Sequence, residues 1–178
     1  MHELLIEELP GVHFRPVSAG NAKVYDNPQL FGSAVAGRFP SAVFDIQEAG
    51  SCFALGRPTA GVMHLMRALE VSLDAIGRGI GVANVIVEAK NSWGTALRHM
   101  REQIEKNDKT KDPAWMAKSS FFHNAHAYLS SVKNAWRNPS MHLEKRYVDK
   151  EAARIYRAVK DFMEHLAEHL DESGQFTP

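Results

Sequence analysis

The stretch from Trp136 to His142, WRNPSMH, brings an arginine, an amide and an imidazole together within one short segment. The planar donor fork of Arg137 matches phosphate oxygens, and the imidazole of His142 can take or give a proton near neutral pH. Asn138 adds an amide directly after the arginine. These groups suit the chemistry of a phosphodiester bond, and the elements on either side must hold them in place.

The Asn138-Pro139 step predicts the backbone around these groups. The residue before a proline is pushed out of the helical region, and Asn followed by Pro is a favourable N-cap and first-turn pair. We therefore expect one helix to end near Arg137 and a short turn to start at Asn138. The free backbone N–H groups of that turn would form an anion-binding end close to Arg137 and His142.

Helical periodicity runs through most of the chain after residue 40. The clearest apolar stripe repeats at steps of three and four: Val62, Leu65, Met66, Leu69, Leu73 and Ile76. Similar patterns predict helices at 41–56, 62–76, 92–104, 112–136 and 149–174, with Ser92, Asp112 and Asp149 as N-caps. Strand signals are few. The sequence predicts an all-α bundle of four or five helices.

The segments between these helices are less regular. The glycine-rich run 77–81 follows a helix and lacks a P-loop lysine, so it is interpreted as a helix stop. The apolar run 82–87 fits either a helix or a strand, and the polar string 107–111 is predicted to be a loop. Closely spaced Pro and Gly residues make 1–40 an irregular extension, 41–172 the helical domain and 173–178 a frayed tail.

Composition limits the classes of function. The chain has 178 residues, with 21 Lys and Arg against 21 Asp and Glu, so one domain without a global basic field is expected. Any contact with RNA must then be local, and a basic rim around the motif is available: Lys133, Arg137, Lys145, Arg146 and Arg154. The single cysteine, Cys52, is interpreted as a core residue, and the acidic start and the absence of a long apolar run predict a cytoplasmic protein without a membrane span.

A polar row lies on the other side of the clearest helix. Arg67 and Glu70 stand one turn apart in this row, between Met63 and Asp74. An ordinary surface ion pair is the first interpretation. The alternative is that Glu70, with Arg67, contributes polar groups to the functional cleft.

Two histidine patterns resemble metal sites only in part. His123 and His126 lie one turn apart without acidic or thiol companions, so structural roles are favoured. The segment from His165 to His169 fits the letters of the H-x-x-E-H zinc signature, but only acidic residues at the same helix end could provide a third protein ligand. We predict neither a metal nor another cofactor.

The segment from Arg137 to His142 resembles the signature of the HEPN superfamily, an arginine and a histidine four to six residues apart with a polar residue, often asparagine, after the arginine. The order of helices over 41–172 is also similar, including the pattern Met66-Arg67-Ala68-Leu69-Glu70 in an early helix. In some HEPN proteins a tyrosine two residues after the histidine is modified by a partner enzyme. This chain has Glu144 there, so that regulation is not expected.

The resemblance implies a helical homodimer with two signatures facing each other across a cleft, and metal-independent cleavage of RNA in active members. The 2′-hydroxyl of RNA can attack its own phosphate while His142 moves the proton, Arg137 neutralises the phosphoryl charge and Asn138 orients an oxygen. One chain offers a single acid–base group, so two chains would supply both the acid and the base.

Three functions remain open from the sequence. The first is an HEPN-like endoribonuclease in a toxin–antitoxin or phage-defence setting, which would have RNA as substrate and an antitoxin or regulatory protein as partner. The second is a catalytically inactive HEPN-like module that binds a nucleotide or a protein. The third is a purely structural dimerisation bundle. Fold similarity does not decide between them.

Overall fold

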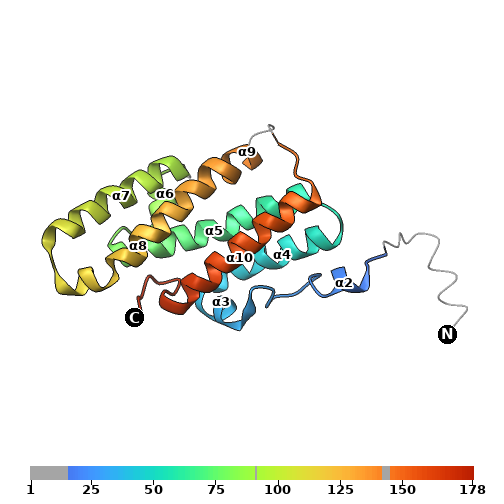
Figure 1. Ribbon diagram of the computed structural model, residues 1–178, viewed down its shortest axis with the longest axis horizontal. Coiled ribbons are helices and arrows are strands. Elements are labelled where there is room, and N and C mark those ends of the chain that lie inside the picture. Colours follow the sequence, from blue (N-terminus) through green and yellow to red (C-terminus); the bar gives the residue numbers. More distant parts are fainter. Residues whose placement is uncertain (1–15, 91, 142–144) are drawn as a thin grey trace, which may run out of the picture.

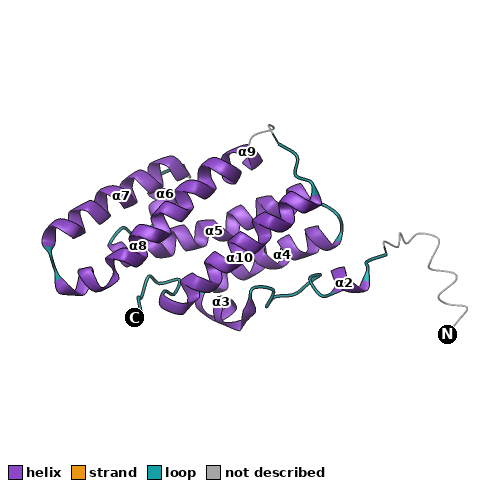
Figure 2. Ribbon diagram, viewed as in Figure 1, coloured by secondary structure: helices purple, strands orange, loops and turns teal. Residues whose placement is uncertain are grey.

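The computed structural model describes residues 16–90, 92–141 and 145–178, and the part it describes is helical without strands (Figures 1 and 2). Its long helices are α4 (Val43–Ala54), α5 (Pro58–Ile80), α7 (Trp93–Thr110), α8 (Pro113–Val132) and α10 (Asp149–His169). The short elements are α2 (Ala19–Ala22), α3 (Gly32–Arg38), α6 (Val85–Glu88), α9 (Asn138–Met141), the 3-10 turn η2 (Pro40–Ala42) and the π turn η3 (Lys133–Arg137). The all-α class is confirmed. Among the described helices, none is both long and apolar enough to cross a membrane.

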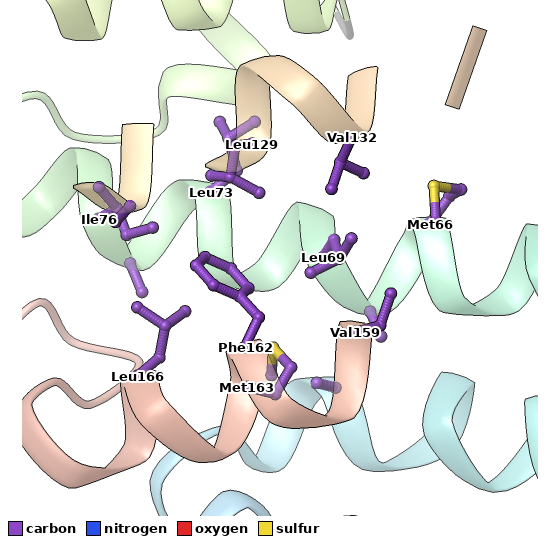
Figure 3. Packing of buried hydrophobic residues seen from close by; sticks show 14 of the residues in the cluster. Met66, Leu69, Leu73, Ile76, Leu129, Val132, Val159, Phe162, Met163 and Leu166 are labelled. Carbon is purple, nitrogen blue, oxygen red and sulfur yellow. The ribbon is translucent and has the colours of Figure 1, made fainter. Parts of the chain in front are cut away.

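Helix α5 lies at the centre of the bundle, and its predicted apolar stripe is buried. Figure 3 shows Leu69, Leu73 and Ile76 of α5 between side chains of α8 on one side and of α10 on the other. Burying an aliphatic side chain of this size contributes about 1.5–3 kcal/mol, so the stripe largely explains the position of α5. Helix α4 also packs along α5, while α7 and α8 run as an antiparallel pair (Figure 1).

The two N-caps predicted around α7 and α8 are confirmed. The Ser92 hydroxyl accepts from the Thr95 N–H at 3.4 Å, and the Asp112 carboxylate accepts from the Ala114 N–H at 3.1 Å. The cap of α10 differs by one residue, because Asp149 is its first helical residue and Val148 occupies the cap position. The side chains of Ser92 and Asp112 thus satisfy backbone donors that have no partner within the helix.

The polar string expected to be a loop is mostly helical, and the apolar run left open between helix and strand ends in a short helix. Helix α7 continues through the polar string to Thr110, and only Lys111, at φ 52°, turns the chain. The Asn107 amide donates to the Ile80 carbonyl at 3.0 Å, so tertiary contact stabilises a segment whose composition favours a loop. The unsettled run 82–87 ends in α6, which starts at Val85.

Both ends of the described chain pack against the bundle. The predicted extension supplies four buried side chains to the core: Leu30, Phe31, Val35 and Phe39. Helix α10 ends at His169, before the predicted Gly174, and the tail then turns back so that the Thr177 N–H donates to the His169 carbonyl at 2.7 Å. The Phe176 ring packs 5.2 Å from Phe121, between centroids. The tail is therefore anchored and not frayed, because this aromatic contact offsets the entropy of ordering it.

Candidate functional site

The signature begins in the π turn η3, which joins α8 to α9. The Asn138 N–H donates to the carbonyl of Lys133, five residues earlier, and Asn138 keeps helical angles of φ −62° and ψ −50°. The boundary predicted near Arg137 coincides with the junction of η3 and α9, but the expected non-helical backbone at Asn138 is wrong. In an α-helix the Pro139 ring would meet the carbonyl four residues before it, and the wider π turn relieves that conflict.

The same hydrogen bond removes the predicted anion-binding end. The Asn138 N–H is already engaged, and α9 has only four residues, which is too short for a substantial helix dipole. An anion at α9 would therefore have to be bound by side chains and not by the helix end. Single π turns within helices often coincide with functional sites, which fits the position of this one at Arg137.

Arg137 lies against Trp93, the first residue of α7. The guanidinium carbon is 6.0 Å from the indole centroid, a cation–π distance, and the Nε atom of Arg137 is shielded from solvent. Trp93 is 1% exposed, and its Nε1–H donates to Glu70 Oε1 at 2.9 Å. One buried indole thus joins the arginine of the signature to the acid that the sequence singled out on α5.

Tyr147 anchors the chain just after the signature. Its hydroxyl donates to the Trp136 carbonyl at 3.2 Å, and its backbone N–H donates to the Thr59 hydroxyl at 2.9 Å in the first turn of α5. The ring is 4% exposed. No sequence pattern pointed to Tyr147, and these contacts show that it fixes the end of η3.

The predicted site residues are therefore brought together in part. Arg137 and Glu70 meet through Trp93, and half-buried Asn138 follows Arg137 directly. His142 and Glu144 lie outside the described residues. The predicted role of His142 stays a prediction.

Arg67 takes a different partner from the one expected. Its Nε donates to Asp45 Oδ1 at 2.9 Å, and His64 Nδ1 donates to the same oxygen at 2.8 Å. The hydrogen bond and charge of Asp45 raise the pKa of Arg67. Asp45 is only 6% exposed. The spacing of α4 gave no signal of this contact, because its partners lie on another helix.

Two shallow hollows are lined by residues that contact or follow members of this site. The acidic hollow, of about 290 Å³, lies between α4, α5 and α6 and is lined by Ser41, Asp45, Arg67, Glu70, Val71, Asp74 and Ile86. The cationic hollow, of about 270 Å³, lies between α7 and α8 and is lined by Gly94, Leu97, Arg98, Arg101, His126, Ser130 and Lys133. Glu70, which lines the first hollow, accepts the hydrogen bond of the Trp93 indole, and Gly94, the next residue after Trp93, lines the second.

The paired histidines of α8 hold α7 in place. His126 Nε2 donates to the Leu97 carbonyl at 2.9 Å, and His123 Nε2 donates to Asp108 Oδ2 at 3.0 Å. The Trp115 indole donates to the other oxygen of Asp108 at 2.8 Å, and this bond, with that of His123, lowers the pKa of Asp108. These contacts support the structural interpretation of both histidines.

At the end of α10, potential ligand atoms of His165, Glu168 and His169 lie within 4.8 Å of one another. Ring contacts explain much of this arrangement, because both imidazoles pack against Phe121 at centroid distances below 6 Å. His169 Nδ1 also donates to the tail carbonyl of Thr177 at 3.2 Å. The cluster lies at the tail and shares no described contact with Arg137.

Cys52 differs from the core residue expected. It is partly buried, and burial together with the nearby charge of Glu48 raises the pKa of its thiol. A raised pKa disfavours the nucleophilic thiolate. Cys52 therefore contributes nothing to the candidate site.

Comparison of the chain with protein-family models, curated proteins and solved structures found no match. The function is therefore inferred from the residues of the candidate site. The strongest arrangement is Arg137 on Trp93, with Glu70 behind the indole and the cationic hollow beside it.

Proposed function

We propose that this chain is a metal-independent endoribonuclease of HEPN type, in which Arg137 and His142 act on the RNA phosphodiester. The observation that carries the proposal is the placement of Arg137 at the end of a π turn, half-buried on the Trp93 ring. A guanidinium held in this way loses less conformational freedom when it binds phosphate than one on a mobile surface chain.

The reaction balances without a metal or an added reagent. His142 takes the proton of the 2′-hydroxyl, the 2′-oxygen forms a bond to phosphorus, and the bond from phosphorus to the 5′-oxygen breaks. The leaving 5′-oxygen receives a proton, so the products carry a 2′,3′-cyclic phosphate and a 5′-hydroxyl. Arg137 stabilises the negative charge that builds on the phosphoryl oxygens, and Asn138 orients one of them.

A second copy of the chain supplies the second acid–base group in this proposal. One His142 acts as base while the His142 of the other copy protonates the leaving oxygen. The proposed homodimer is therefore part of the mechanism. The toxin–antitoxin or defence setting, with an antitoxin or regulatory protein as partner, rests on the resemblance alone.

The test is cleavage of a mixed panel of single-stranded RNAs by the purified protein in excess EDTA. We expect Arg137→Ala and His142→Ala each to lower the cleavage rate by about 100-fold or more, because each removes a group that acts in the transition state. Arg137→Lys keeps the charge but not the planar donor fork, so it should recover only part of the rate. The products should carry cyclic phosphate ends.

Matched controls use residues of the same types outside the signature. Arg67→Ala and His123→Ala remove an arginine and a histidine that have protein partners elsewhere, and both should cleave like the wild type. Circular dichroism must show that all variants are folded. Equal cleavage by every variant would refute the assignment of Arg137 and His142.

Binding without cleavage is the second candidate function. The half-burial of Arg137 and the cationic hollow would also suit a module that grips a nucleotide phosphate without catalysing its transfer. RNA that remains intact after long incubation, but binds in an Arg137-dependent way, would support this candidate over the nuclease.

A further inference from the structure

The cationic hollow lies directly beside the arginine of the signature. Lys133 and Arg137 are the first and last residues of the π turn, and Arg137 rests on Trp93. A Cβ atom placed on Gly94, the next residue of α7, would lie 4.0 Å from Lys133 Nζ. Lys133 therefore reaches over the start of α7, at the end of the hollow nearest Arg137.

The described lining of this hollow carries positive charge and no acid. Arg98 and Arg101 come from α7 and Lys133 from η3, while the polar Ser130 comes from α8. The acidic hollow has three acids against one arginine. Of the two hollows, the one between α7 and α8 is therefore the better match for a polyanion.

The two arginines remain available to an anion. Arg98 pairs with Glu102 at 3.0 Å and Arg101 with Glu105 at 3.9 Å, both within α7 and about half-exposed. Arg98 Nη2 also contacts His99 Nε2 at 3.3 Å. Exposed pairs of this kind contribute little, and each guanidinium has five N–H donors, so a phosphate can share or replace the glutamate.

The dimensions of the hollow fit a short piece of a nucleic-acid strand. From Trp93 to Arg101 the helix advances about 12 Å at about 1.5 Å per residue. A stacked strand places one phosphate about every 3.4 Å, so the row spans about three nucleotides. The hollow is too shallow and polar to enclose a drug-sized apolar ligand.

We infer that the cationic hollow is a phosphate subsite, in which Arg98, Arg101 and Lys133 bind the single-stranded RNA backbone next to the phosphate held by Arg137. This inference rests on the proposed function, because RNA is its ligand. The three cations position the strand and do not touch the reacting atoms. They should act on RNA affinity and KM more than on kcat.

The test measures binding of a short, fluorescently labelled single-stranded RNA that is 2′-O-methylated throughout and so cannot be cleaved by 2′-hydroxyl attack. The full chain is compared with the triple variant Arg98→Gln, Arg101→Gln, Lys133→Gln. The matched control is Arg38→Gln, Arg157→Gln, Lys160→Gln, which removes the same number of charges from α3 and α10 (Figure 1). Affinities are measured between about 50 mM and about 200 mM salt.

The hollow variant should bind at least about ten-fold more weakly at the lower salt, and the slope of log affinity against log salt should fall by about 2, at about 0.7 per phosphate contact. The control should change affinity by less than about two-fold. Equal loss in both variants, or no binding by the wild type, would overturn the inference.

Parallel assays with unmodified RNA separate this inference from the nuclease proposal. Cleavage by the wild type with unchanged binding and KM in the hollow variant would overturn the subsite and leave the nuclease in place. Hollow-dependent binding without any cleavage would remove the nuclease and support the subsite as an RNA-binding site. A raised KM with unchanged kcat in the hollow variant would support both.

Discussion

The acidic and cationic hollows are similar in volume, but the charged residues that line them are mostly of opposite sign. In the acidic hollow the charged groups are tied to one another across helices, as Asp45 is to Arg67 and His64. In the cationic hollow the arginines pair only within their own helix. The first arrangement locks α4 to α5, whereas the second leaves cations available to a ligand.

This difference explains how a chain of zero formal charge could recognise a polyanion. Equal totals of acids and bases do not prevent charge from separating locally, and Trp93 contacts one acid, Glu70, and one base, Arg137. Glu70 accepts from the indole N–H while the Arg137 guanidinium lies over the ring. The arginine and the acid thus contact the same buried indole.

Removal of the Trp93 ring should have the largest effect on stability. Trp93→Ala deletes a buried aromatic ring and the donor to Glu70, so we expect a loss of about 3–5 kcal/mol in the free energy of unfolding, measured by chemical denaturation. Trp93→Phe keeps a ring for Arg137 but not the N–H donor, and should lose less. A loss below about 1 kcal/mol for Trp93→Ala would contradict a structural role for the buried indole.

A change confined to the acidic hollow should affect stability without affecting RNA. Asp45→Ala removes the acceptor shared by His64 and Arg67, so we expect a loss of about 2 kcal/mol, measured by the same method. Asp161→Ala, an exposed acid on α10, is the control and should stay within about 0.5 kcal/mol of wild type. Affinity for the uncleavable RNA should be unchanged, and a marked drop would place the ligand on the acidic side.

A smaller effect is expected at Glu70. In Glu70→Gln the amide oxygen still accepts from Trp93, so stability should change by about 1 kcal/mol or less. Loss of the negative charge should raise RNA affinity at low salt, by about two-fold at most. A large fall in cleavage with normal binding would instead assign Glu70 a direct part in the reaction.

The smallest expected effect is a dependence of stability on acid pH. It arises at Asp108 of α7, which accepts hydrogen bonds from Trp115 and His123 of α8. Its folded-state pKa is lowered, so its contribution to stability is full above about pH 4 and is lost as the pH falls through the folded-state value. The difference in unfolding free energy between wild type and Asp108→Asn should therefore shrink below about pH 4. Because Asp108 is exposed, the difference should be small, and a constant difference across pH would contradict this origin.

The features that sequence predicted well are those with a local cause. The apolar stripe of α5 repeats with the helical period, and Ser92 and Asp112 are short polar residues in front of apolar runs. Each signal lies within a few residues of its effect. The fold class and the start of α7 and α8 therefore follow from propensity and pattern.

The features that sequence missed depend on contacts between distant segments. Trp93 and Arg137 are 44 residues apart, and the pattern of neither helix indicates that they meet. The same holds for Asp45 with Arg67, and for Phe176, which packs on α8. At Asn138 the proline that follows favours a non-helical backbone, but the unforeseen π turn keeps Asn138 helical.

The π turn also changes what a one-residue deletion before the signature would do. A π turn holds one residue more than the α turn it replaces, so deletion of Ala135 would restore regular winding and leave the residues beyond it in nearly the same orientation relative to α8. A deletion in the regular part of α8 would instead rotate everything beyond it by about 100°, and the guanidinium would leave the face of Trp93. A relative with one residue fewer in 133–137 should therefore keep the orientation of the motif, whereas a gap earlier in α8 should change it.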